Sequence, residues 1–183
     1  MSWIEQRPDD AMDGAFAAFA PDHIPTVPAG QFREAMSHLG AAVHVITTAG
    51  PAGRSAFTAT AACSVSDQPP TLLVCVNRRA QSAPIVSANG VFCVNTLRAG
   101  QESIADFFAK KSSNKAAAFE TSEWMSLETG SPVLSSAVVA CDCRIIELKQ
   151  VASHTVIFGA VTGVHLGPPG LALVYHDRAY KQI

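Results

Sequence analysis

Apolar and polar positions divide the chain into a helical start and a long region of strands. Phe32, Met36 and Leu39 stand at helical spacing, which predicts a helix over residues 31–39. Two later runs are almost continuously apolar and therefore predict strands that are buried on both faces. These runs are TLLVCVN at 71–77 and VFCVNTL at 91–97.

The rest of the pattern adds more strands than helices. Further strands are predicted at 41–48, 136–151, 154–166 and 172–180. Helices are predicted at 80–89, with an interruption at Pro84, at 101–111 and at 114–120. Many strands, few helices and no regular strand–helix alternation indicate a mostly β fold, a closed antiparallel barrel with a few peripheral helices. Residues 1–30 are proline-rich with little periodicity and predict a flexible N-terminal arm, which leaves 31–183 as one domain.

Composition excludes several classes of function. Hydrophobic residues make up 48% of the 183 residues and charged ones 15%, which favours a homo-oligomer because monomers rarely expose large apolar patches. The formal net charge is −2 without a basic block, so the positive surface of a nucleic-acid binder is missing. No apolar run reaches the ~18–20 residues of a membrane span, and MSWIEQRPDD does not have the pattern of a signal peptide. Five cysteines, an odd number without C-x-x-C, indicate free thiols in a reducing cytoplasm.

Few side chains are arranged for acid–base, nucleophilic or metal chemistry. The chain contains no G-x-G-x-x-G, G-x-x-x-x-G-K-[ST], H-E-x-x-H or G-x-S-x-G. His38 and His44 stand six apart across a predicted helix–strand junction, which is a poor spacing for a metal pair, so no metal is expected. Where side-chain chemistry is scarce, a bound cofactor usually carries the reaction and the protein orients it.

The side chains of the segment FTATAACSVSDQPP at 57–70 are smaller than those of an ordinary core strand, and they carry less charge than those of an ordinary loop. Thr58, Thr60, Ser64 and Ser66 stand there among alanines, one cysteine and one valine. Small side chains let the backbone approach a flat, uncharged ring, and the hydroxyls can reach the polar edge of that ring. The alternative is a tight strand pair packed against a neighbouring element.

Four tracts in this order, FREAM, TATAACSVSDQPP, FCVNTL and LVYHDRAY, resemble the flavin reductase family, the FMN-binding split barrels. The resemblance spans roughly residues 31–182. The segments GAAVHVITTAGPAGR and PPTLLVCVNR look closest to the pyrimidine-utilisation flavin reductases, and the cob(II)yrinic acid a,c-diamide reductases are similar too.

This resemblance implies a split-barrel homodimer that binds FMN, with FAD possible, at the subunit interface. It implies hydride transfer from NADH or NADPH to flavin N5 and supply of reduced flavin to a separate oxygenase. Two alternatives stay open: a flavin-bound reductase of a larger acceptor such as a corrinoid, and a non-enzymatic flavin-binding protein.

The resemblance also implies which residues form the site. His154 is the candidate catalytic residue that orients NAD(P)H, with Ser153 in place of the family's usual aspartate. For Arg78 and Arg79 two roles stay open, a contact to the flavin phosphate and a solvated surface position. Lys110 is an alternative to Lys111 as a phosphate contact. The cofactor-binding candidates are Thr58, Ala59, Thr60, Ala61, Ser64, Val65, Ser66, Asn77, Ser82, Phe108, Lys111, Ser112, Arg178 and Tyr180.

Overall fold

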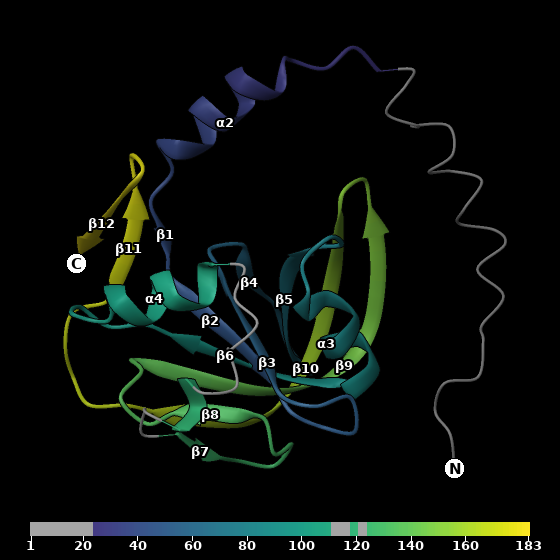
Figure 1. The fold of residues 1–183 in the computed structure, drawn as a ribbon, viewed down its shortest axis with the longest axis vertical. Coiled ribbons are helices and arrows are strands. Elements are labelled where there is room, and N and C mark those ends of the chain that lie inside the picture. Colours follow the sequence, from purple (N-terminus) through teal and green to yellow (C-terminus); the bar gives the residue numbers. More distant parts are fainter. Residues whose placement is uncertain (1–23, 111–117, 121–123) are drawn as a thin grey trace, which may run out of the picture. The chain divides into compact units, whose positions relative to one another are not determined.

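A computed structural model describes residues 24–110, 118–120 and 124–183 (Figure 1). The chain divides into two compact units, Met1–His38 and Leu39–Ile183. No helix among the described residues is both long enough and apolar enough to span a membrane.

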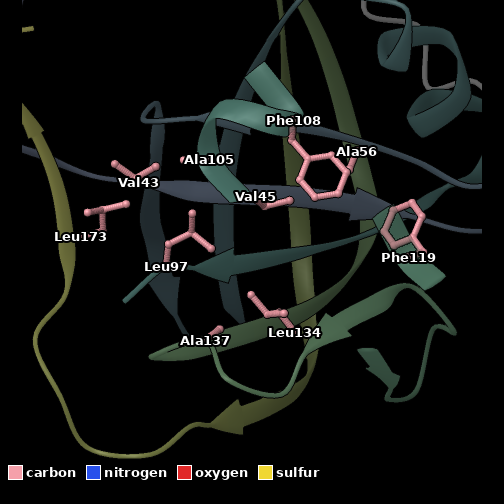
Figure 2. Close-up of a cluster of buried hydrophobic side chains, with 10 residues drawn as sticks. All are labelled: Val43, Val45, Ala56, Leu97, Ala105, Phe108, Phe119, Leu134, Ala137 and Leu173. Carbon is pink, nitrogen blue, oxygen red and sulfur yellow. The ribbon is translucent and has the colours of Figure 1, made fainter. Parts of the chain in front are cut away.

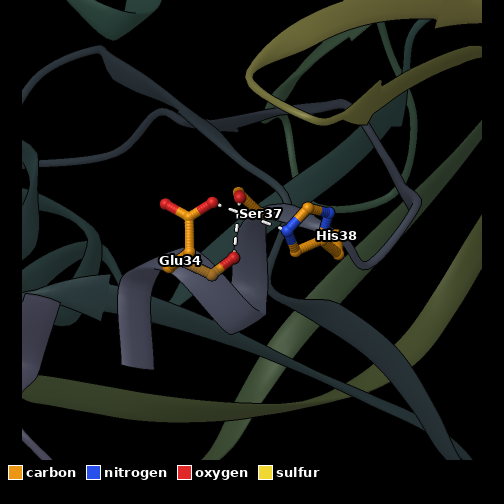
Figure 3. A network of polar contacts seen from close by, with 3 residues as sticks. All are labelled: Glu34, Ser37 and His38. Atoms are coloured by element: carbon orange, nitrogen blue, oxygen red, sulfur yellow. Dashed lines mark hydrogen bonds and ion pairs between the residues drawn. The ribbon is translucent and has the colours of Figure 1, made fainter. Parts of the chain in front are cut away.

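The first unit contains the predicted helix, which is confirmed as α2 (Ala29–Ser37). Its C-terminal turn is closed by local polar contacts (Figure 3). Ser37 Oγ donates to the Glu34 carbonyl at 2.7 Å, and His38 Nε2 lies 3.5 Å from Glu34 Oε1, one helical turn away. The histidine therefore lies against a carboxylate of its own helix, a contact that contributes little because both side chains are exposed.

The second unit is built from antiparallel strands with the helices α3 (Ser82–Asn89) and α4 (Glu102–Ala109), and its described residues 118–120 are also helical. Its strands are β1 (Ala41–Ala42), β2 (His44–Thr48), β3 (Ser55–Ala59), β4 (Ala62–Asp67), β5 (Pro70–Asn77), β6 (Val91–Thr96), β7 (Trp124–Ser126), β8 (Pro132–Leu134), β9 (Val139–Val151), β10 (His154–Leu166), β11 (Leu173–His176) and β12 (Ala179–Gln182). The mostly β prediction is confirmed.

The main sheet has seven strands in the order β3-β2-β6-β9-β10-β5-β4, and all of its ladders are antiparallel (Figure 1). Smaller sheets have the orders β1-β11-β12 and β7-β8. The two edge strands β3 and β4 follow each other in the chain and are joined by residues 60 and 61. Among the described residues no ladder joins these edges, so closure of the barrel stays a prediction.

Burial along the two most apolar runs differs. The 91–97 run is buried along nearly its whole length, as expected. The 71–77 run alternates instead: Val74 and Val76 are fully buried, while Leu73 and Cys75 are only half-buried. In a single copy of the chain the second face of β5 is therefore only partly buried, and burial of both faces stays a prediction.

Two local predictions are corrected by the backbone. Helix α3 runs unbroken past Pro84, because this proline lies in the first helical turn, where backbone N–H groups have no intrahelical acceptor. The run 172–180 forms the β11–β12 hairpin rather than one strand, since Asp177 and Arg178 both take positive φ, 49° and 57°. Two left-handed residues in succession make the turn whose twist suits a hairpin.

The hydrophobic core forms two main clusters, one under each helix. In the first, Ala105 and Phe108 of α4 pack with Val45 of β2 and with Leu97, which directly follows β6 (Figure 2). In the second, α3 contributes Ala83 and Val86, which pack on buried side chains of β2, β3, β5, β6 and β10. Each helix is thus held against the sheet by its apolar face, and one end of each lies beside the β3–β4 connection.

Candidate functional site

A cavity of about 710 Å³ lies where β3, the 60–61 bend, the end of β5, the start of α3, the end of α4 and the start of β10 converge. Its size is within the range of small-molecule and cofactor sites. The lining residues are Phe57, Thr58, Ala59, Thr60, Ala61, Cys75, Val76, Asn77, Arg79, Ala80, Gln81, Ser82, Phe108, Ala109, Lys110 and His154.

One wall of the cavity, the small-residue wall, consists of residues 57–61. Strand β3 ends at Ala59 and β4 begins at Ala62, so residues 60 and 61 form a bend between two strands. The bend is fixed by backbone bonds: Ala62 N donates to the Thr60 carbonyl at 3.1 Å, and Cys75 N donates to the Ala61 carbonyl at 3.0 Å. With only alanines and threonines at 58–61, a flat ligand can approach this backbone closely.

The hydroxyls of this segment have different partners. Thr58 Oγ1 donates to the carbonyl of Ala105 at 2.6 Å and so holds α4 beside the small-residue wall. Ser66 Oγ accepts from Gln68 N at 3.0 Å and closes the turn after β4. Thr60 is exposed at the bend and lines the cavity, whereas Ser64 is exposed on β4 outside it.

A second part of the lining, the loop wall, consists of Asn77, residues 79–82 and His154. Asn77 Oδ1 accepts from Arg79 N at 2.9 Å, and the Asn77 carbonyl accepts from Ala80 N at 2.9 Å, so the chain turns directly after β5. Ser82 then begins α3 and is buried. No side chain caps this helix, and Gln81 and Ser82 at its start line the cavity, so the positive end of its dipole begins at the lining.

The charged side chains among the described lining residues are all cationic. These are Arg79 and Lys110, and no carboxylate is among the described lining residues. They come from separate elements, the turn after β5 and the residue after α4. Two cations beside an uncapped helix start form a site suited to an anion such as a phosphate group.

His154 is the first residue of β10, pairs with Asn77 of β5 and lines the cavity. Its Nδ1 lies 2.9 Å from Ser153 Oγ, so the hydroxyl of the neighbouring residue orients the ring. Ser153 follows Ala152, whose φ of 47° makes the tight turn between β9 and β10. An imidazole fixed at the end of a hairpin can bind and orient a ligand that covers the cavity.

Two titratable side chains in or beside the cavity, Cys75 and His44, have pKa values shifted in favour of the neutral form. Burial, followed by the nearby Cys63, raises the pKa of the Cys75 thiol, so Cys75 is not an activated nucleophile. Burial lowers the pKa of His44 to about 4, and its Nδ1 lies 3.0 Å from Thr96 Oγ1. Because His44 pairs with Ala59 across the sheet, this neutral side chain forms part of the support of the small-residue wall.

Comparison with protein families settles the membership of the chain. The model of the flavin reductase like domain matches residues 36–183. The chain belongs to this family. The sequence-based recognition is thereby confirmed, and the match includes both walls of the cavity.

Characterised relatives agree. The FMN reductase (NADH) RutF of Variovorax paradoxus is 42% identical over 172 residues, which cover 91% of this chain and 95% of that protein. RutF of Escherichia coli O6:K15:H31 is 48% identical over 152 residues, covering 83% and 92% of the two chains. Among solved structures, BorF, the flavin reductase component of a bacterial two-component tryptophan halogenase, is 26% identical with a TM-score of 0.80, covering 85% and 98%.

The structure brings together about half of the site residues predicted from the sequence. The cavity lining contains Thr58, Ala59, Thr60, Ala61, Asn77, Ser82, Phe108 and His154. Outside it lie Ser64, Val65, Ser66, Arg178 and Tyr180. Lys111 and Ser112 lie outside the described residues.

Tyr180 has a different contact from the one expected. Its hydroxyl donates to Asp106 Oδ1 at 2.8 Å, and its ring packs edge-on against Tyr175 at 5.4 Å. Burial, and then this hydrogen bond, raise the pKa of Tyr180 to about 12. The side chain thus fastens the β11–β12 hairpin to α4, while Arg178 lies in the turn of that hairpin.

Sequence reasoning did not select several lining residues. They are Phe57, Cys75, Val76, Ala80, Gln81 and Ala109. Cys75 enters the site because the register places it beside Ala61, and no short motif encodes that register. Arg79 rather than Arg78 lines the cavity because the chain turns at Asn77. An asparagine before two arginines could have indicated this turn in the sequence.

Proposed function

We propose that this chain is an NADH-dependent FMN reductase that transfers hydride to flavin N5 and supplies reduced flavin to a separate oxygenase. The observation that carries the proposal is the cavity, whose lining combines the neutral small-residue wall with the cations Arg79 and Lys110 and has no carboxylate among its described residues. FMN combines a flat neutral ring with a phosphate, which matches this lining. The RutF relatives are named as NADH-dependent FMN reductases, and BorF as a reductase component.

The small-residue wall is the proposed contact for the isoalloxazine ring. Thr58, Ala59, Thr60 and Ala61 present short side chains, so the ring can lie against the backbone of the bend. Phe108 of α4 closes the same side and excludes water. Because Thr58 Oγ1 already donates to Ala105, its expected role is to hold α4 rather than to donate to the ring.

The loop wall is the proposed contact for the ribityl phosphate. Ser82, the start of α3, Arg79 and Lys110 supply hydroxyl, backbone and cationic donors around one end of the cavity. Asn77 shapes this loop through its bond to Arg79 N and remains a proposed contact. Lys111 and Ser112 continue the chain after Lys110 and remain proposed phosphate contacts.

His154 is the proposed ligand of the nicotinamide nucleotide. The flavin, when bound, accepts the hydride, and transfer between two stacked rings depends mainly on distance and alignment. His154 lies at the edge of the cavity with its ring oriented by Ser153, where it can fix a nucleotide placed over the flavin. No general acid or base is needed for this step, in agreement with a lining that contains no carboxylate among its described residues.

Two copies of the chain are proposed to form a homodimer with the cavity at the subunit interface. The uncovered face of β5, with Leu73 and Cys75 half-buried, and Val65 at 49% exposure on β4 support this assembly. In such a dimer Ser64, Val65, Ser66 and Arg178 are proposed to complete the partner's site. Closure of the sheet between β3 and β4 is proposed with it, because the two edges are continuous through residues 60 and 61.

Further features are proposed on weaker support. Residues 1–30 form an arm and 31–183 the domain, in accord with a family match that begins at residue 36. The compartment is the cytoplasm, in accord with five cysteines that are all free thiols. FAD and NADPH are proposed as poorer substrates than FMN and NADH, in accord with the names of the RutF relatives.

Anaerobic mixing of the purified protein, FMN and NADH tests this function. Bleaching of the visible flavin absorbance that depends on protein, and catalytic NADH oxidation when free FMN is in excess, are expected. A protein that binds FMN but leaves it oxidised would be a binding protein, and one that binds no FMN would refute the proposal. Dependence of NADH oxidation on an added corrinoid would favour the acceptor-reductase alternative.

A further inference from the structure

The tip of the β9–β10 hairpin, residues 150–154, is attached to the loop wall by Arg78. The Arg78 guanidinium donates to Gln150 Oε1 at 3.1 Å, and Arg78 N donates to the Ser153 carbonyl at 3.0 Å. Arg78 itself does not line the cavity, although Asn77 and Arg79 on either side of it do. Its side chain therefore points away from the ligand space and toward the hairpin that carries His154.

Besides the last pairs of the β9–β10 and β5–β10 ladders, this tip has little buried surface to stabilise it. From Glu147 to Val151 every residue of β9 is exposed, so almost no apolar burial stabilises the end of the strand. Ala152 takes a left-handed φ of 47°, a conformation that costs a residue other than glycine about 1–2 kcal/mol. A segment with little burial and a strained turn opens easily, so its few hydrogen bonds decide where it lies.

The beginning of β10 connects this tip to the cavity. His154 pairs with Val151 of β9 and with Asn77 of β5, at the last position of both ladders. The Ser153 hydroxyl that contacts His154 Nδ1 belongs to the residue whose carbonyl accepts from Arg78. A displacement of the tip therefore moves both the imidazole and the group that orients it.

We propose that Arg78 and Gln150 act as a clamp that positions His154 over the cavity. Arg78 and Gln150 are thus positioning residues for the nicotinamide nucleotide and not phosphate ligands. This inference rests on the proposed reductase function for its kinetic consequence, but the clamp itself is a property of the ligand-free chain. Anion binding is left to Arg79 and Lys110, which do line the cavity.

The test compares Arg78→Ala, Gln150→Ala and the double variant, with Arg54→Ala as the control. Arg54 is an exposed arginine between β2 and β3 and lines no part of the cavity. Each clamp variant is expected to raise the KM for NADH about 3–10-fold, which corresponds to the net free energy of one side-chain hydrogen bond. The Kd for FMN should stay unchanged. The double variant should be no worse than either single one, because both remove the same contact.

Amide hydrogen exchange of the flavin-free protein gives a second readout. Residues 150–154 should exchange faster in both single variants, while exchange in α3 and in the Arg54→Ala control stays unchanged. Gln150→Glu keeps an acceptor for the Arg78 guanidinium. The amide exchange of residues 150–154 and the KM for NADH should therefore stay at their wild-type values in this variant.

The outcomes separate the two proposals. Faster exchange in a protein that does not reduce flavin would refute the reductase function and leave the clamp standing. In an active wild-type protein, unchanged exchange and KM in Arg78→Ala would overturn the clamp. A raised Kd for FMN with an unchanged KM for NADH would also overturn the clamp, because it would indicate that Arg78 is a phosphate ligand.

Discussion

The two walls of the cavity differ in how they are built and in what they offer a ligand. The small-residue wall belongs to a regular strand and a two-residue bend, and its side chains are neutral. The loop wall is irregular, begins where β5 ends, and carries the cation Arg79 and the start of α3. A sheet fixes shape well, whereas loops and helix ends supply charge and orientation on that scaffold.

The walls also differ in what stabilises them. Behind the small-residue wall lie buried contacts: His44 pairs with Ala59, and Thr58 bonds to Ala105 of α4. The loop wall depends on exposed hydrogen bonds, such as Asn77 with Arg79 N and Arg78 with Gln150. Changes in the first wall should therefore affect both stability and ring binding, and changes in the second should affect affinity and kinetics with little loss of stability.

Filling the small-residue wall should give the largest effect. Ala61→Phe places a large ring where the flavin ring is proposed to lie, and Ala61 is exposed, so folding should tolerate it. We expect FMN affinity to fall at least about 100-fold, since overpacking in a ligand site costs several kcal/mol. Fluorescence titration with FMN measures this, and Ala179→Phe, at an exposed site on β12, is the control. An unchanged FMN affinity in Ala61→Phe would show that the flavin ring does not bind at this wall.

Acid should weaken the support behind the same wall. His44 has a pKa of about 4 in the folded protein against the ordinary histidine value of 6.5, so the unfolded chain binds the proton more readily. Stability is therefore complete above pH 6.5 and falls as the pH drops toward 4, by about 3 kcal/mol in total. Urea unfolding at several pH values measures this, with His44→Gln as the variant that should lose the dependence in this window. An equal slope in both proteins would contradict the assignment.

Removing His154 should separate the two ligands. We expect His154→Ala to raise the KM for NADH about 10-fold while the Kd for FMN stays nearly constant, because the imidazole is proposed to contact the nucleotide. Steady-state kinetics and FMN titration on the same preparation check both values. Equal loss of both would place His154 on the flavin and contradict the division between the walls.

The smallest expected effects come from the two bonds that hold α4. Thr58→Val removes the bond to the Ala105 carbonyl and should lower the free energy of unfolding by about 1–1.5 kcal/mol, the upper part of the usual range for one hydrogen bond, because this bond is partly buried. Tyr180→Phe removes the exposed bond to Asp106 and should cost about 0.5–1 kcal/mol. Thermal and urea unfolding measure both. A larger loss in Tyr180→Phe would reverse the order of the two contacts.

Sequence reasoning predicted those parts of the fold whose signal is local. Strand β6 was predicted because its residues are almost continuously apolar. The β11–β12 hairpin was missed since its turn uses Asp177 and Arg178 without glycine.

The candidate site was predicted less completely. Contact of Cys75 with Ala61, and of Tyr180 with Asp106, depends on register and on packing between distant elements, which a single sequence does not encode.

The central claim, that the loop wall holds the phosphate and the small-residue wall the ring, is tested most directly by comparing FMN with riboflavin. Both ligands are titrated into the wild-type protein and into an Arg79→Ala/Lys110→Ala double variant. The wild type should prefer FMN by about 10–100-fold, as expected for charge-assisted bonds to a phosphate, and the variant should lose this preference while binding riboflavin as well as the wild type does. An undiminished preference for FMN in the variant, or an equal loss of both ligands, would contradict the claim.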